Sequence, residues 1–173
     1  MNIKLAVIEG HGDLCRMTLR TQFSADIQAV WRVITQVDQL KIWWPDWQPG
    51  GVLEPFERGR VVLGDGRWID GEVKVWAPPH VLAFSWREDT AGGDWFEAHT
   101  KSLLTIQLLQ INSTQIELTL FQYAPRDSIV GGIAGWHYFA GERLKSLLES
   151  EAFDDRAERF DELVALYEEG HGN

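Results

Sequence analysis

Apolar residues recur at helical spacing between Ile129 and Glu149, and this segment is the longest predicted element of the chain. Steps of three and four residues place Ile133, Trp136 and Ala140 on one side of a helix, whereas a strand would scatter them. Such a helix would be ~30 Å long, about the width of a small domain. It contains several glycines, each of which weakens a helix by about 1 kcal/mol relative to alanine. We therefore expect a close contact or an open space beside its backbone, at Gly131, Gly132, Gly135 and Gly141.

Shorter helical patterns lie on both sides of this segment. After Ser24, a candidate N-cap, the apolar positions of a short amphipathic helix are Ile27, Val30, Trp31 and Ile34. A second short helix is expected over 38–43, because Pro45 follows it. After the long helix, a further helical pattern is formed by Phe153, Ala157, Phe160, Val164 and Tyr167, with Asp155 as a candidate cap.

Alternating apolar and polar residues predict strands over much of the remaining chain. The expected strands cover 3–8, 14–23, 61–63, 68–76, 81–87, 96–110 and 114–123, with glycine, proline and asparagine in the turns between them. In the last three strands the apolar positions share one face: Leu82, Phe84, Trp86, Phe96, Ala98, Leu104, Ile106, Leu108, Ile116, Leu118 and Leu120. The long helix is able to cover this face. The pattern thus predicts an α+β fold, with one antiparallel sheet covered on one side by helices.

The length of 173 residues and the hydrophobic content of 45% favour a single domain over 1–173 with a real core. No apolar run approaches the ~20 residues needed to cross a bilayer, so membrane insertion is not expected. The first residues do not resemble a secretory signal, and the single cysteine, Cys15, cannot form an internal disulfide. We therefore expect a reducing, cytoplasmic location.

The net charge of −10 is unevenly distributed along the sequence. Residues 141–173 contain ten acids and four bases, which gives −6 on this part alone. An acidic surface repels phosphate groups, so nucleic acid and anionic membranes are poor candidate partners. For the acidic segment we favour a solvated helix face over a docking patch for a basic partner.

Several short motifs follow one another across 16–150: Val30-Trp31, Trp43-Trp44, Pro49-Gly50-Gly51, Gly71-Glu72-Val73, Pro78-Pro79, Leu82-Ala83-Phe84-Ser85-Trp86 and Gly135-Trp136. Their order and spacing resemble the START-like (SRPBCC, Bet v 1-like) superfamily, and within it the branch related to the activator of heat-shock protein 90 ATPase. The resemblance implies a helix-grip fold, in which a curved antiparallel sheet wraps around a long C-terminal α-helix. It also implies two short helices near the N-terminus that close one end of a lipid-binding-like cavity.

The same resemblance implies a range of functions. Members typically bind apolar small molecules, whereas some are cyclases or hydrolases and others are chaperone cofactors linked to the stress response. The acidic helical extension over 151–173 lies outside the best-matching part. The last strand ends in Leu120-Phe121-Gln122-Tyr123 where many relatives have a polar ending, so we expect a more apolar pocket floor.

Nine tryptophans exceed what core filling requires, and Trp43, Trp44 and Trp47 cluster where the second short helix ends. Aromatic rings suit a planar or ring-containing ligand, although the same rings also serve to seal a core. The candidate ligand-binding residues are Trp44, Trp47, Phe84, Trp86, Phe96, Leu104, Leu120, Trp136, His137 and Ala140.

Candidate catalytic groups are few. Asp70 and Glu72 point to the same side of a predicted strand, but the apolar phase of that strand places them outside. His99 follows a polar phase, whereas His137 adjoins the apolar stripe, where it is placed to bond a ligand or a buried acid. No spacing of histidine, cysteine or carboxylate residues matches a metal site, and no phosphate-binding loop is present. We therefore expect no metal, nucleotide or other cofactor and assign no catalytic residue.

Three hypotheses follow from these patterns. The first, which we favour, is the binding of a small hydrophobic or aromatic molecule between the sheet and the long helix. The second is a protein-interaction module of the chaperone-cofactor type, with a chaperone or another protein as its partner. The third is a cyclase- or hydrolase-type enzyme that acts on a hydrophobic substrate, and the sequence favours it least.

Overall fold

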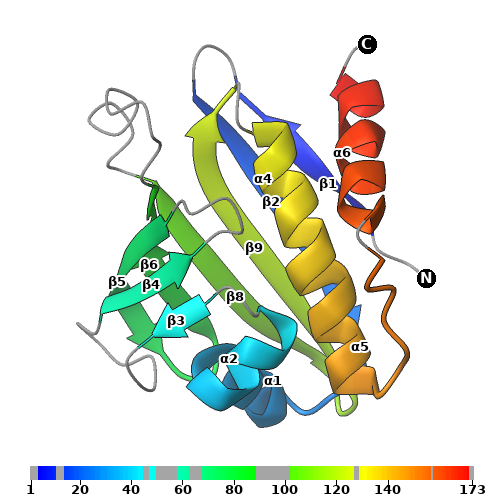
Figure 1. Cartoon of the computed structure of the whole chain (residues 1–173). Coiled ribbons are helices and arrows are strands. Elements are labelled where there is room, and N and C mark those ends of the chain that lie inside the picture. Colours follow the sequence, from blue (N-terminus) through cyan, green and yellow to red (C-terminus); the bar gives the residue numbers. More distant parts are fainter. Residues whose placement is uncertain are drawn as a thin grey trace.

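A curved antiparallel sheet and a long helix that crosses its concave face form the frame of the protein (Figure 1). The computed structural model describes residues 4–10, 14–44, 47–49, 58–62, 68–88, 102–126, 129–156 and 158–171. In these residues the strands are β1 (Lys4–Glu9), β2 (Leu14–Phe23), β3 (Trp47–Pro49), β4 (Arg58–Val62), β5 (Trp68–Ala77), β6 (Val81–Ser85), β7 (Arg87–Glu88), β8 (Leu103–Asn112) and β9 (Gln115–Pro125).

The strands pair in the order β1-β2-β9-β8-β6-β5-β4-β3, and β7 pairs with β5. All of these pairings are antiparallel, as the alternating pattern of the sequence predicts. The longest pairing joins β2 and β9, from Leu14 opposite Pro125 to Phe23 opposite Ile116. The predicted inner face is confirmed over 82–86, 104–108 and 116–120, where the apolar side chains are buried. Part of the predicted strand 96–110, including Phe96, lies outside the described residues.

The helices are α1 (Ile27–Thr35), α2 (Val37–Trp43), α4 (Ile129–Trp136), the π-helical segment η1 (His137–Arg143), α5 (Leu144–Glu149) and α6 (Glu158–His171). The last strand is followed by α4, η1 and α5 as one continuous helix, which confirms the predicted bounds 129–149. Its middle is nevertheless π-helical, and the N–H of Leu144 donates to the carbonyl of Phe139 five residues earlier. The helix-grip fold implied by the motifs is thereby confirmed.

Two helix boundaries differ from the sequence-based expectation. Asp26, and not Ser24, caps α1, because its carboxylate accepts hydrogen bonds from the N–H groups of Gln28 and Ala29. The last helix begins at Glu158, so Phe153 lies in the connector before it. The buried side of α6 carries Leu163 and Tyr167, whereas Phe160 is exposed. Phe153 therefore belongs to a connector that packs against the long helix without being helical.

The long helix lies close to the sheet in its first turn. A Cβ atom placed on Gly132 would lie 3.0 Å from the terminal methyl carbon of Met17 on β2. Nothing lies within 4 Å of the corresponding position on Gly131. The sequence predicted either a close contact or an open space beside these glycines. Gly132 has the close contact, and Gly131 has the open space. No helix in the described ranges is both long and apolar enough to cross a membrane.

Figure 1 places α1 and α2 at one end of the sheet and α6 beside α4 and β1. The connector between α5 and α6 leaves the long helix at Ser150, which has a left-handed backbone conformation with φ 54°. The N–H groups of Ser150 and Glu151 both donate to the carbonyl of Ser146, which closes the helix. The chain then returns along the outer side of the long helix, so α6 covers a face that the sheet does not reach.

Candidate functional site

Three tryptophans from different elements meet between the sheet and the long helix. Trp44 follows α2, Trp86 follows β6 and Trp136 ends α4, and all three side chains are buried. The rings of Trp44 and Trp86 are nearly parallel, with centroids 5.9 Å apart. Trp136 meets both rings edge to face, at 5.1 Å from Trp44 and 5.4 Å from Trp86. We call these residues the tryptophan cluster, and their contacts have the two geometries that aromatic pairs prefer.

Further aromatic rings extend the tryptophan cluster in two directions. Trp43 stacks on Trp44 at 5.9 Å, and Phe84 lies 6.3 Å from Trp86. Phe139, on η1, lies 6.5 Å from Trp44. The α2 helix, β6 and the long helix therefore contribute to one continuous aromatic surface.

A buried amide supplies the polar group of this site. The indole N–H of Trp136 donates to Oε1 of Gln122 at 3.0 Å, and Gln122 is only 3% exposed. The amide nitrogen of Gln122 donates to the hydroxyl of Ser102 at 3.1 Å, and that hydroxyl donates to the carbonyl of Tyr123 at 2.6 Å. The last strand therefore points an amide into the interior. The floor expected to be more apolar than in relatives thus contains one buried polar group, because Gln122 continues the inward phase of Leu120.

His137 belongs to a second polar group on the other side of the long helix. Its Nδ1 lies 2.8 Å from the hydroxyl of Tyr167 on α6, and its Nε2 lies 3.6 Å from Oε1 of Glu142. The N–H of Ala6 on β1 donates to the same tyrosine oxygen at 3.2 Å, so this hydroxyl joins β1, the long helix and α6 in one polar group. Glu142 also accepts hydrogen bonds from the guanidinium of Arg159 on α6. His137 therefore lies beside a buried acid, although 3.6 Å is too long for a hydrogen bond, and the hydrogen bond expected for it remains a prediction.

Burial determines how these groups titrate. Loss of water lowers the pKa of His137, and the positive charge of Arg159 adds to this effect, while Glu142 opposes it. Burial likewise raises the pKa of Tyr167, and the charge of Glu142 acts in the same direction. Hydrogen bonds to Glu142 raise the pKa of Arg159. His137 and Tyr167 are therefore neutral near pH 7, and they lie beside the ion pair of Glu142 and Arg159. These contacts hold α6 against the long helix.

The remaining candidate residues divide into two sets. The inner face of the sheet and the long helix bury Phe84, Leu104, Leu120 and Ala140. The backbone of Trp47 lies in β3, but its side chain lies outside the described residues, as does all of Phe96. These predicted binding roles remain predictions.

Of the two carboxylates considered for catalysis, the structure describes the side chain of only one, Glu72. The carboxylate of Glu72 pairs with Lys74 at 3.0 Å and is half-exposed. The side chain of Asp70 and all of His99 lie outside the described residues. In the part of the chain that is described, no three histidine, cysteine or acidic side chains come together in a group able to hold a metal ion.

Sequence reasoning did not identify Gln122, Glu142 and Tyr167 as a set of buried polar partners. The inward phase of the last strand could have identified Gln122, since it follows Leu118 and Leu120 by steps of two. Glu142 had no such pattern, because it lies five residues after His137 and the two share a face only in a π-helix.

The comparisons with known proteins agree with this architecture. The family described as "Activator of Hsp90 ATPase homolog 1-like protein" matches residues 24–149. A conserved protein of unknown function from Enterococcus faecalis has a similar structure, with a TM-score of 0.75 and 20% identity over 95% of this chain and 89% of that chain. CalU16 from Micromonospora echinospora gives a TM-score of 0.73 and 15% identity, with 98% of each chain covered.

A third similar structure is the solution structure of the Aha1 dimer from Colwellia psychrerythraea. Its TM-score is 0.62, with 18% identity over 78% of this chain and 96% of that chain. At these identities the structural likeness concerns the fold alone. No protein with a curated function matches the sequence.

Proposed function

Because this chain belongs to the family of Activator of Hsp90 ATPase homolog 1-like proteins, we propose that it binds a small hydrophobic or aromatic molecule between the sheet and the long helix. The family match confirms the resemblance predicted from the short motifs, and proteins of this fold commonly bind ligands or act as cyclases. The choice of a small hydrophobic or aromatic ligand rests on the residues that this chain places in the interior.

The tryptophan cluster is the observation that carries the proposal. Trp44, Trp86 and Trp136 provide flat apolar surface from three separate elements, and the amide of Gln122 lies beside it. Ligand sites are mostly apolar and contain a few placed polar groups that orient the ligand. A planar molecule would gain ring contacts of about 0.5–1.5 kcal/mol each by stacking on this cluster. A flat, uncharged ring system is therefore the ligand class that these side chains favour.

Energy transfer from tryptophan to a neutral fluorescent probe tests this function. N-phenyl-1-naphthylamine should bind saturably and quench tryptophan emission. Trp44→Leu should weaken its binding by about threefold to tenfold, as expected for the loss of one ring contact. Trp76→Leu is the matched control, because Trp76 is half-buried and pairs with Trp31 at 5.4 Å, apart from the cluster.

Each result of this titration bears on the proposal. Loss of affinity in Trp44→Leu alone, with the circular dichroism spectrum of both variants unchanged, supports the site. Absence of saturable binding in the unaltered protein would refute the proposal. An equal loss in both variants would place the probe elsewhere.

A second candidate function is contact with a chaperone. The outer face of β8 exposes Leu103, Leu109 and Ile111, and the last two are 62% and 45% exposed. Exposed apolar side chains of this kind are typical of interaction surfaces when they occur together. If this face binds a chaperone of the Hsp90 class, Leu109→Asp should abolish both co-purification and any change in the chaperone's ATPase rate.

The control for this experiment is Val7→Asp, since Val7 is also exposed but lies on the edge strand β1, which β2 and β9 separate from β8. An unaltered protein that neither co-purifies with the chaperone nor changes its ATPase rate would argue against this second function.

A further inference from the structure

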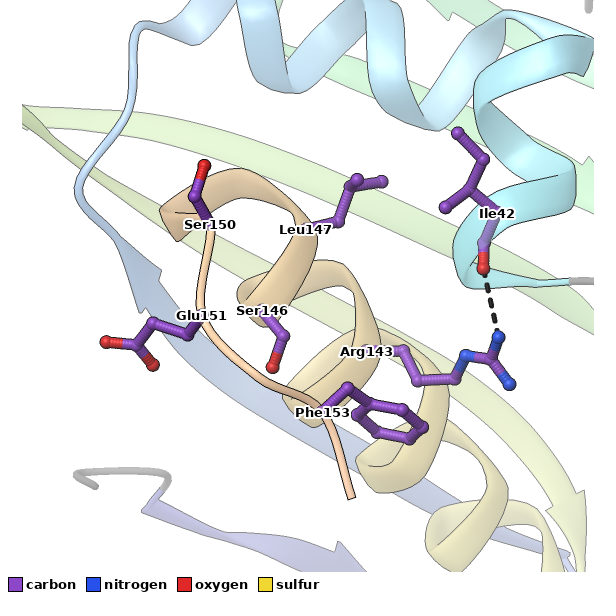
Figure 2. A pocket seen from close by; sticks show the side chains of 7 residues that line it. All are labelled: Ile42, Arg143, Ser146, Leu147, Ser150, Glu151 and Phe153. Atoms are coloured by element: carbon purple, nitrogen blue, oxygen red, sulfur yellow. Dashed lines mark hydrogen bonds between the residues drawn. The ribbon is translucent and has the colours of Figure 1, made fainter. Parts of the chain in front are cut away.

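A surface groove of about 450 Å³ opens where α2, the end of the long helix and the connector to α6 meet (Figure 2). Ile42 on α2, Leu147 on α5 and Phe153 in the connector form its apolar walls. Arg143 and the hydroxyls of two serines, Ser146 and Ser150, supply polar atoms. The groove lies outside the tryptophan cluster and shares no lining residue with it. Its volume falls within the range of ligand-binding pockets.

Arg143 is the positively charged residue of the groove, and its guanidinium is held in place from two sides. Nη2 donates to the carbonyl of Ile42 at 3.0 Å, and the guanidinium carbon lies 4.9 Å from the ring centre of Phe153 (Figure 2). Among the residues that the structure describes, no carboxylate pairs with Arg143. A guanidinium carries five N–H donors, and the contact with Ile42 uses one of them. Donors therefore remain for a ligand.

The lack of a carboxylate partner is notable in so acidic a protein. The chain has 26 acidic and 16 basic residues, and the connector and α6 are rich in carboxylates. Both arginines of that segment have such partners, Arg156 with Asp154 and Arg159 with Glu142. Glu151 also lines the groove, but in Figure 2 its carboxylate points away from Arg143, on the other side of the connector.

We propose that this groove binds a small carboxylic acid with an apolar body, and that Arg143 pairs with its carboxylate. A guanidinium matches a carboxylate with two parallel hydrogen bonds, and the contact with the Phe153 ring orients its plane in advance. The hydrocarbon or aromatic body of the acid would lie along Leu147 and Ile42. The inference does not depend on the proposed function of the interior site.

The electrostatics of the long helix fix the direction of the ligand. The helix ends at Glu149, and its last carbonyls give this end a partial negative charge. A carboxylate is therefore disfavoured near Ser150 and favoured about two turns earlier, beside Arg143. The hydroxyl of Ser146 faces the groove in Figure 2 and is positioned to donate to the ligand. The expected orientation has the acid group at Arg143 and the apolar body along Ile42 and Leu147.

Nuclear magnetic resonance titration of the full chain tests the proposal with 4-phenylbutyrate as the probe and 4-phenylbutyramide as its neutral match. The acid should shift backbone amides around 143–153 and should bind about tenfold or more tightly than the amide, because a charge-assisted bond is lost in the latter. Arg143→Gln should reduce binding of the acid by a similar factor. Arg143→Lys should restore only part of it, because an ammonium keeps the charge but lacks the planar fork.

Arg32→Gln is the matched control, since Arg32 is exposed on α1 and does not line the groove. Equal binding of acid and amide, or unchanged affinity in Arg143→Gln, would overturn the proposal. A peptide with a free C-terminal carboxylate that binds more tightly than 4-phenylbutyrate would overturn the assignment to a small molecule. Quenching by N-phenyl-1-naphthylamine should persist in Arg143→Gln, so failure at this groove and failure at the interior site give different results.

Discussion

At the scale of single residues, one amide joins the aromatic interior to the sheet. Gln122 accepts from Trp136 and donates to Ser102, whose hydroxyl donates on to the carbonyl of Tyr123. Every member of this chain of hydrogen bonds is therefore satisfied. A buried polar group is tolerated only under this condition, because an unpaired group in the interior costs about 1–3 kcal/mol.

Replacing Gln122 with leucine should lower the free energy of unfolding by about 1–3 kcal/mol, since it leaves the indole N–H of Trp136 buried without its acceptor. Urea unfolding followed by tryptophan fluorescence measures this loss. Gln107→Leu on β8 is the matched control, because Gln107 is exposed and should change stability by less than about 0.5 kcal/mol. Equal stabilities of the two variants would show that the interior hydrogen bond contributes nothing.

The side chain of His137 makes stability depend on pH. Burial holds its pKa below the ordinary value of 6.5 in the folded protein, so the unfolded chain binds the proton more readily. Stability should therefore fall as the pH drops below about 6.5, by up to ~1.4 kcal/mol for each unit by which the pKa is lowered. The groups that face the imidazole are Tyr167, Glu142 and Arg159.

Urea unfolding of the unaltered protein and of His137→Gln between pH 7.5 and 5 checks this dependence. The variant should show a flatter profile over this range, because the group that takes up the proton is gone. The pKa of Glu149 is also lowered: burial would raise it, but hydrogen bonds from Lys145 and Ser24 outweigh that effect. Its contribution is lost only at lower pH, so it does not obscure the test. Identical slopes for the two proteins would contradict the assignment to His137.

At the scale of elements, the two adjacent glycines at the start of the long helix have different surroundings. Gly132 faces the methyl end of Met17, whereas Gly131 is exposed and has no neighbour within the range of a methyl group. Gly131 therefore lowers the stability of the helix, and no close contact at this position requires a glycine.

The variants Gly131→Ala and Gly132→Ala separate these two cases. Gly131→Ala should raise the free energy of unfolding by up to ~1 kcal/mol, the difference in helix propensity between alanine and glycine. Gly132→Ala should gain less, because Met17 must move by a few tenths of an ångström to admit the new methyl group. Thermal unfolding followed by circular dichroism compares the two. A larger gain at Gly132 would contradict the close approach of helix and sheet.

The periodicity of the sequence was sufficient to predict the long helix, its bounds and the inner faces of three strands. Alternation and helical spacing report which side chains share a face, and Trp136 and Leu120 lie where these patterns place them. The change to π-helical bonding at His137 leaves no such pattern, because it depends on contacts with α6 and the sheet. The start of α6 was also missed, since Phe153 continued the apolar spacing although it packs on Arg143 in the connector.

At the scale of the whole molecule, α6 is an addition outside the matched family segment 24–149. It packs beside α4, and Tyr167 gives a hydrogen-bond acceptor to the edge strand β1 (Figure 1). Its apolar anchor is small, with Leu163 and Tyr167 as the buried side chains among its described residues. Docking of α6 therefore depends strongly on few contacts.

Leu163→Ala should cost about 2–4 kcal/mol, because it opens a cavity beneath α6. Amides over 158–171 should then exchange with solvent faster than those of β8 and β9. Leu166→Ala is the matched control, since Leu166 is 42% exposed on the same helix. Mass spectrometry of hydrogen exchange resolves the two regions. Uniformly faster exchange across the whole chain would show that α6 unfolds only together with the sheet.

The wide turn at His137–Arg143 constrains how this fold can vary. An α-helix places residues five apart roughly 140° from one another, at about 100° per residue, so only the wider turn lets His137 and Glu142 meet. Loss of one residue between them would let this segment return to α-helical bonding, so the helix beyond it would keep its direction and Leu144 would stay in the core. The histidine and the glutamate would then be four residues apart, a spacing that also places two side chains on one face of an α-helix. Relatives that share the long helix should therefore differ in length by one residue within this turn more readily than elsewhere along the helix.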